Sequence, residues 1–160
     1  MPSRVQKKQT DLLKESHSVT RALLDGVDPE IRVYKKPDWR IRDVIGHIAT
    51  WDREVTKSLN AFRLGEEYSI SDLEEDDFNE QAVLEQNKLN FQQVYLEWEK
   101  AREDFIEAVQ KIPLDQFQGD LLYPWGDDRG SISKLVEIMV EHDEEHRDEI
   151  KRAIRALKAD

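Results

Sequence analysis

The sequence predicts an all-α fold, a four-helix bundle with a long connection before its last helix. Apolar residues recur at steps of three and four along four long segments, as they do on the buried face of an amphipathic helix. Glycine or proline follows three of these segments, at Gly26, Gly65 and Pro113. Both residue types commonly follow the end of a helix. Alternation of apolar and polar residues, which a half-buried strand requires, never lasts more than a few positions.

The first helix is expected over residues 3–25, with Gly26 as its stop. The second is expected to begin near Asp38 or Trp39, where Asp38 is a suitable N-cap, and to end at Gly65. These two helices account for the first half of the bundle.

The third helix is expected as one continuous element over residues 78–111, because Pro113 prevents its continuation. Residues 114–130 then form a long connection that is rich in large side chains, and residues 121–125 within it suit a short strand. Connections of this length are usually functional or cover another part of the protein. The fourth helix is expected to begin near Ser131, capped by that hydroxyl, and to run almost to the end of the sequence.

Composition excludes several classes of function. The 160 residues fit one domain, expected to span residues 1–160, with a real core. A net charge of −11 argues against nucleic acid and anionic membranes as partners. The chain has no cysteine, so thiolate zinc sites and iron–sulfur clusters are excluded. No stretch approaches a membrane span and the first residues lack the pattern of a secretory signal, so a cytoplasmic protein is expected.

His142 and His146 are the most informative residues, because they lie one helical turn apart on the face that carries Leu135, Met139 and Ile150. Two imidazoles in a bundle core need partners for their ring nitrogens. Imidazoles four residues apart on one helix face can both reach a single cation. The alternatives are hydrogen-bonded core histidines and a solvent-facing pair.

A catalytic zinc site commonly uses three protein ligands and keeps one position for water. Only His17 and His47 remain as further imidazoles. His17 is expected on the exposed part of the first helix. His47 lies on the shoulder of the apolar stripe of the second helix, from which it could reach a groove between helices.

Four segments together resemble the DinB-like family of damage-inducible four-helix bundles. They are Trp39–Trp51 around His47, Phe78–Glu80, Trp125–Gly126, and Val140–Ile150 around the histidine pair. The resemblance extends from about Trp39 to Ile154, and the first helix fits it only in general character. Carried over residue by residue, it implies that His47, His142 and His146 bind zinc or nickel, with solvent completing the coordination shell.

The resemblance also implies a function. Relatives include thiol-dependent S-transferases and isomerases, so we expect a metal-dependent enzyme that acts on a small molecule, by thiol S-transfer or hydrolysis. A low-molecular-weight thiol is then a candidate cofactor, and a homodimer, which is common in such bundles, is a candidate assembly. The metal would lower the pKa of a bound thiol or water. The alternatives are a non-catalytic small-molecule-binding or stress-response bundle and a metal-free structural bundle.

Several residues near the predicted site have candidate roles, although no catalytic residue can be assigned. Trp51, Tyr123 and Trp125 are expected to wall a pocket. Asp52 lies on the apolar stripe of the second helix; it could orient a ligand imidazole, but pairing with an arginine such as Arg21 is favoured. Asn79 is a candidate for closing a helix end. The run Asp143–Glu145 is expected to be a solvated face of the last helix.

Overall fold

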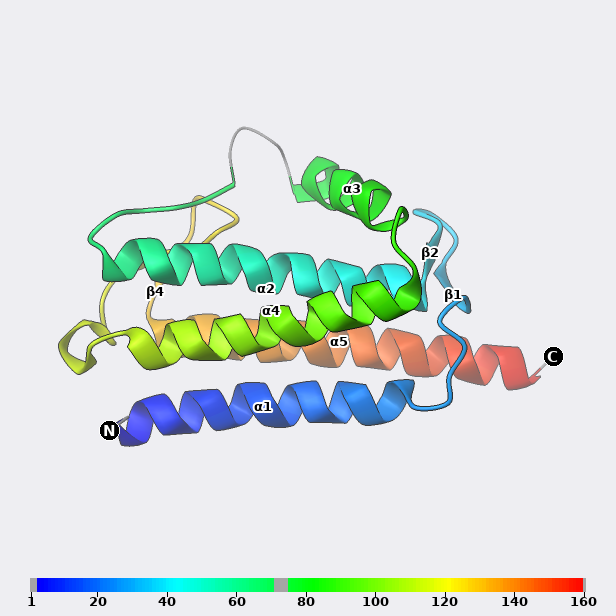
Figure 1. The fold of residues 1–160 in the computed structure, drawn as a ribbon, viewed down its shortest axis with the longest axis horizontal. Coiled ribbons are helices and arrows are strands. Elements are labelled where there is room, and N and C mark those ends of the chain that lie inside the picture. The colour runs from blue at the N-terminus through cyan, green and yellow to red at the C-terminus, as the bar shows by residue number, and fades with distance from the viewer. Residues whose placement is uncertain (1–2, 71–74, 160) are drawn as a thin grey trace.

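The computed structural model describes residues 3–70 and 75–159. Four long helices lie side by side in it: α1 (Arg4–Leu24), α2 (Ile41–Arg63), α4 (Phe91–Lys111) and α5 (Ile132–Ala159) (Figure 1). Helices α1 and α5 run in one direction, and α2 and α4 run in the opposite one. The predicted four-helix bundle is confirmed.

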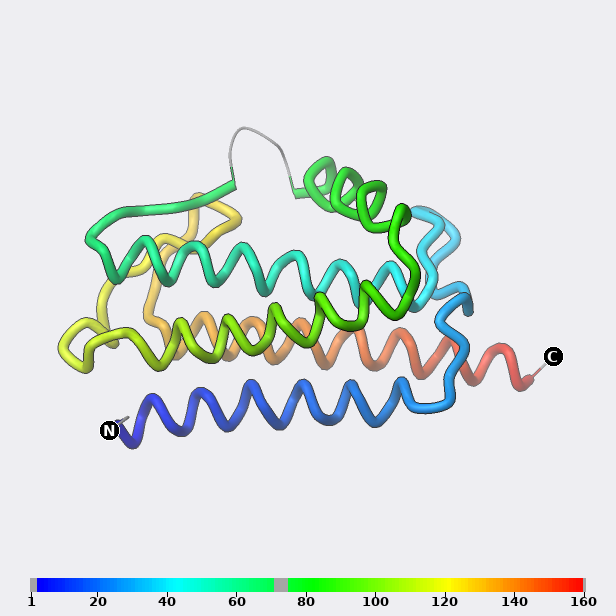
Figure 2. The backbone as a smooth tube through the Cα atoms, viewed as in Figure 1, coloured from blue at the N-terminus to red at the C-terminus, as the bar shows by residue number. Residues whose placement is uncertain are grey.

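Parallel neighbours in a bundle need a long return connection. After α2, residues 64–70 turn back along that helix (Figure 2), and a shorter helix, α3 (Glu75–Gln86), packs on its outer side. The prediction of one continuous helix over residues 78–111 is therefore wrong. The break has a local cause at Asn90. Its side chain accepts a hydrogen bond from the backbone N–H of Gln93 at 2.9 Å, and the Gln93 side chain accepts one from the N–H of Asn90 at 2.9 Å, which starts a new helix.

A short antiparallel hairpin joins α1 to α2, formed by β1 (Arg32–Tyr34) and β2 (Trp39–Arg40). Helix α2 therefore begins later than predicted, because Trp39 belongs to a strand. The expected N-cap at Asp38 is also wrong. The carboxylate of Asp43, in the first turn of α2, instead accepts a hydrogen bond from the N–H of Arg40 at 2.8 Å.

The connection before α5 contains a 3₁₀ turn (Leu114–Gln116) and a second hairpin, formed by β3 (Leu121–Leu122) and β4 (Arg129–Gly130). Only the first two residues of the strand expected at 121–125 belong to a strand. The predicted cap at Ser131 is confirmed, since its hydroxyl oxygen accepts from the N–H of Lys134 at 3.1 Å.

The apolar core divides into two clusters along the bundle. On α4 one cluster ends at Ala101 and the other begins at Phe105. Arg102 lies between them, and it meets Asp52 of α2 and Asp143 of α5 at the same level. A buried charged layer thus separates the two apolar halves. No helix among the described residues is long and apolar enough to cross a membrane.

Candidate metal centre

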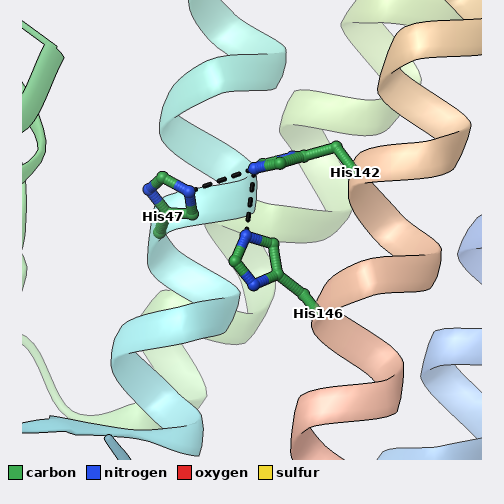
Figure 3. A group of neighbouring side chains, drawn as sticks. All are labelled: His47, His142 and His146. Atoms are coloured by element: carbon green, nitrogen blue, oxygen red, sulfur yellow. Dashed lines mark hydrogen bonds between the residues drawn. The ribbon is translucent and has the colours of Figure 1, made fainter.

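Three imidazoles from two helices converge inside the bundle (Figure 3). His47 comes from α2, and His142 and His146 come from α5. The Nε2 atom of His142 lies 3.1 Å from Nε2 of His47 and 3.0 Å from Nε2 of His146. Ligand nitrogens around a tetrahedral zinc ion lie about 3.3 Å apart, because each zinc–nitrogen distance is about 2.0–2.1 Å. The separations found here are close to that value.

Burial keeps the three rings neutral near pH 7. It lowers the pKa of His146 to about 3, and the neighbouring His142 lowers it further in the same direction. The pKa of His47 is well below its ordinary value for the same two reasons, and burial also lowers the pKa of His142. Neutral imidazoles carry the lone pairs that a metal ion binds.

Hydrogen bonding among the rings cannot satisfy the cluster. A neutral imidazole carries one N–H, so the Nε2 of His142 can donate to only one of the two nitrogens that face it. If Nε2 of His142 is instead the acceptor, its single lone pair faces two donors, so neither tautomer of His142 satisfies both contacts. A divalent cation would accept all three lone pairs, so this donor set fits a zinc or nickel ion.

The outer nitrogen of His146 has a carboxylate partner. Its Nδ1 lies 3.0 Å from Oε1 of Glu149 and 3.4 Å from the hydroxyl of Tyr34. A carboxylate at this position favours the tautomer with the proton on Nδ1, which leaves the Nε2 lone pair directed at the centre of the cluster. The Nδ1 of His142 has no hydrogen-bond partner among the described residues.

A cavity of about 250 Å³ opens beside the cluster. Trp51 and Trp125 line it, as expected, and the Nε1–H of Trp51 donates to Oδ1 of Asn79 at 2.7 Å. Tyr123 is not among its lining residues, because it is 1% exposed and its hydroxyl donates to the carbonyl of Ser131 at 2.8 Å. The complete lining is His47, Trp51, Glu75, Asn79, Trp125, Ile138, Met139 and His142.

Sequence reasoning missed part of this lining. Asn79 was expected to close a helix end, but it bonds to Trp51 instead. The position of Ile138 could have been predicted from the sequence, since it precedes His142 by four residues on the same helix and so lies on the same side. The positions of Glu75 and Asn79 could not, because α3 has only two buried residues and no clear apolar stripe.

His17 was expected on the surface, and this is wrong. It is 6% exposed, its ring centroid lies 3.8 Å from that of Trp98, and its Nε2 lies 3.2 Å from Oε1 of Glu99. The spacing of residues along α1 explains this burial. His17 follows Leu13 by four residues and precedes Leu24 by seven, so the three share one face of α1.

Asp52 forms the favoured structural pairing, but with a different arginine. Its carboxylate accepts from Nε of Arg102 at 2.8 Å, whereas Arg21 binds Glu99. Asp143 was expected to be solvated, and this is also wrong, because it is 2% exposed and accepts from Nη1 of Arg102 at 2.9 Å. The next two residues, Glu144 and Glu145, are exposed as expected.

Comparison with known proteins identifies the family of this chain. The model of the DinB superfamily matches residues 12–150. The chain belongs to the DinB superfamily. The match includes most of α1, although the sequence of this helix resembles the family only in its general character. A search of curated proteins found no match.

Solved structures share the fold at low sequence identity. The mycothiol-dependent maleylpyruvate isomerase superposes with a TM-score of 0.74 and 15% identity over 90% of this chain. This chain spans 60% of the length of that isomerase. YfiT from Bacillus subtilis, described as a probable metal-dependent hydrolase with an unusual four-helix bundle topology, superposes with a TM-score of 0.75 and 15% identity over 99% of this chain and 91% of its own.

Proposed function

We propose that this DinB-superfamily protein is a metal-dependent enzyme that acts on a small molecule, by thiol S-transfer or hydrolysis. His47, His142 and His146 would hold a zinc or nickel ion. The observation that carries the proposal is the convergence of three neutral Nε2 atoms beside an open cavity. A hydrogen-bonded core cluster would instead pair each lone pair with a proton.

A divalent ion on three neutral ligands keeps its full charge and lowers the pKa of a water or thiol bound to it. The protein residues have separate roles. The carboxylate of Glu149, 3.0 Å from Nδ1 of His146, would favour the tautomer with the proton on that nitrogen. Trp51, Trp125 and Met139 give the cavity apolar walls, against which a small substrate can exclude water. Asn79 is fixed by its bond to Trp51 and offers an amide inside the cavity.

The names of two similar structures fall within or near this range of reactions. One is named as a thiol-dependent isomerase and the other as a probable metal-dependent hydrolase. At 15% identity they establish the fold alone. Transfer to a thiol and hydrolysis share the requirement for an activated nucleophile, and the proposed centre would supply it in either case.

Metal analysis and a turnover screen test the proposal. Protein purified without chelators is expected to contain one zinc or nickel per chain, and His142→Ala to contain almost none. Glu145→Gln is a matched control, because Glu145 is exposed on the same helix and outside the centre. The enzyme is then screened against electrophiles with low-molecular-weight thiols, and against esters and amides. Wild-type protein without stoichiometric metal would overturn the proposal, whereas metal without turnover would identify a binding protein.

The homodimer and the cytoplasmic location also stay predictions. Light scattering coupled to size-exclusion chromatography tests the first, and cell fractionation tests the second.

A further inference from the structure

Arg102 lies at the centre of the bundle and contacts the other three long helices. It belongs to α4 and is 1% exposed. Its Nε and Nη2 donate to Asp52 of α2 at 2.8 and 3.2 Å, and its Nη1 and Nη2 donate to Asp143 of α5 at 2.9 and 3.1 Å. Nη1 also donates to the carbonyl of Leu13 of α1 at 3.2 Å. All five N–H groups of the guanidinium are therefore used.

The two carboxylates lie on the helices that carry the three imidazoles. Asp143 directly follows His142 on α5, and Asp52 follows His47 on α2 by little more than one helical turn. The guanidinium thus joins the two halves of the candidate metal centre. Each carboxylate accepts two hydrogen bonds from the planar guanidinium. The arrangement therefore fixes both the distance from Arg102 to each carboxylate and the orientation of that carboxylate.

Asp143 is held from a second side. Its Oδ2 accepts from the hydroxyl of Ser16 at 2.7 Å, and that hydroxyl accepts from Nη1 of Arg147 at 3.0 Å. Nη1 of Arg147 also donates to the Ser16 carbonyl at 2.9 Å and to the hydroxyl of Thr20 at 3.0 Å. These bonds tie α5 to α1, so a rotation of α5 about its axis would break bonds on both sides of Asp143.

A buried ion-pair network is a poor source of net stability. Removing charges from water is costly, and well-packed apolar residues of similar volume often serve as well or better. The geometry of the histidines, in contrast, is demanding. An imidazole nitrogen lies roughly 6 Å from its helix axis, so turning α5 by about 5° moves it by about 0.5 Å. Metal–nitrogen distances tolerate only about 0.2 Å.

We propose that Arg102 is a positioning residue, which sets the orientation of α2 and α5 so that His47 and His142 can share one metal ion. The inference rests on the proposed metal site. In this view, the role of the buried charged layer is to maintain the geometry of that site, and not to stabilise the bundle.

Measurements of cobalt binding distinguish a role in positioning the metal ligands from a role in stabilising the bundle. Co²⁺ reports its own coordination through its visible absorption, which is intense for four-coordinate and weak for six-coordinate ions. Arg102→Lys keeps the positive charge but removes the planar guanidinium that donates to both carboxylates. We expect its cobalt affinity to fall by about 10- to 100-fold, the range found for residues that support metal ligands, and its absorption to weaken. Circular dichroism at the same temperature checks that the helices remain.

Val109→Ala is the matched control. Val109 is fully buried on the same helix, about two turns after Arg102, and belongs to one of the two apolar clusters. It is expected to lower the urea midpoint while the cobalt affinity and spectrum stay within two-fold of wild type. If Arg102→Lys fails to fold, Asp52→Asn replaces it, with an expected loss of about ten-fold.

The outcomes are distinct. Wild-type affinity and spectrum in Arg102→Lys, or in Asp52→Asn, would overturn the positioning role and leave the metal site intact. Equal losses of affinity in Arg102→Lys and Val109→Ala would overturn it as well, since general loosening of the bundle would then explain both. Failure of the wild-type protein to bind cobalt would instead count against the proposed function itself.

Discussion

At the residue scale, His17 shows what burial does to an ionisable group outside the metal centre. Its ring packs against that of Trp98 at an interplanar angle of 32° and faces Glu99. Burial lowers its pKa to about 4, with the positive charge of Arg102 acting in the same direction and Glu99 opposing it. The unfolded chain binds a proton at this residue near pH 6.5. The unfolded state therefore binds more protons than the folded state between these two values.

Because of this difference, His17 contributes stability that is fully present above pH 6.5 and is lost as the pH falls toward 4. From the two pKa values we expect the free energy of unfolding at pH 5 to lie about 2 kcal/mol below that at pH 8 on account of this residue. In His17→Gln that part of the pH dependence should disappear. Urea unfolding of both proteins at pH 8, 6 and 5 measures it, and parallel pH profiles would contradict the prediction.

At the element scale, the position of α3 decides part of the cavity lining. The helix is anchored near its end by Gln86, whose Nε2 donates to the carbonyl of Gly46 at 2.9 Å and to the hydroxyl of Thr50 at 3.2 Å. A Cβ atom on Gly46 would lie only 2.1 Å from Oε1 of Gln86. Gly46 thus makes room for the side chain that docks α3, and α3 carries Asn79 and Glu75 to the cavity.

Gly46→Ala should therefore have opposite effects in two backgrounds. In the wild-type chain it displaces the amide of Gln86 and breaks its bonds, so we expect lower stability. In Gln86→Ala the space is free, and alanine should raise the free energy of unfolding by up to about 1 kcal/mol through its higher helix propensity. Urea unfolding of the four proteins gives the coupling energy, expected at about 1–3 kcal/mol. A coupling near zero would mean that the two residues do not interact.

At the scale of the whole molecule, the candidate centre joins the second helix of the bundle to the last. A metal ion that binds the folded state alone stabilises it, by about 2.7 kcal/mol when free metal is at 100 times the dissociation constant. For a chain of this length that is a rise in Tm of roughly 5–10 °C. We expect added zinc to produce such a rise in wild-type protein that has first been stripped of metal with a chelator, and renewed chelation to reverse it.

His142→Ala is the control for this measurement. Its Tm should be insensitive to zinc, because the remaining imidazoles on α2 and α5 lose the nitrogen that lies between them. Differential scanning fluorimetry with and without zinc tests both proteins. An equal shift in the two would show that zinc stabilises the bundle from another site.

Much of the architecture was accessible from sequence because it depends on local periodicity. Apolar steps of three and four specified the four bundle helices, and the hydroxyl of Ser131 marked where the last one begins. The pair His142 and His146 followed from spacing within a single helix. His47 needed the family resemblance, because its position on the stripe alone was ambiguous.

The sequence by itself determined which faces of the helices are buried and that two imidazoles share one of them. Only the tertiary structure decided how charged residues on those faces are paired. Arg102 lies four residues after Trp98 and three before Phe105, so periodicity places it inside, yet nothing local identifies Asp52 and Asp143 as its partners. The physical reason is that such a pairing depends on the relative rotation and height of separate helices, which is fixed by their packing against one another and not by any one segment.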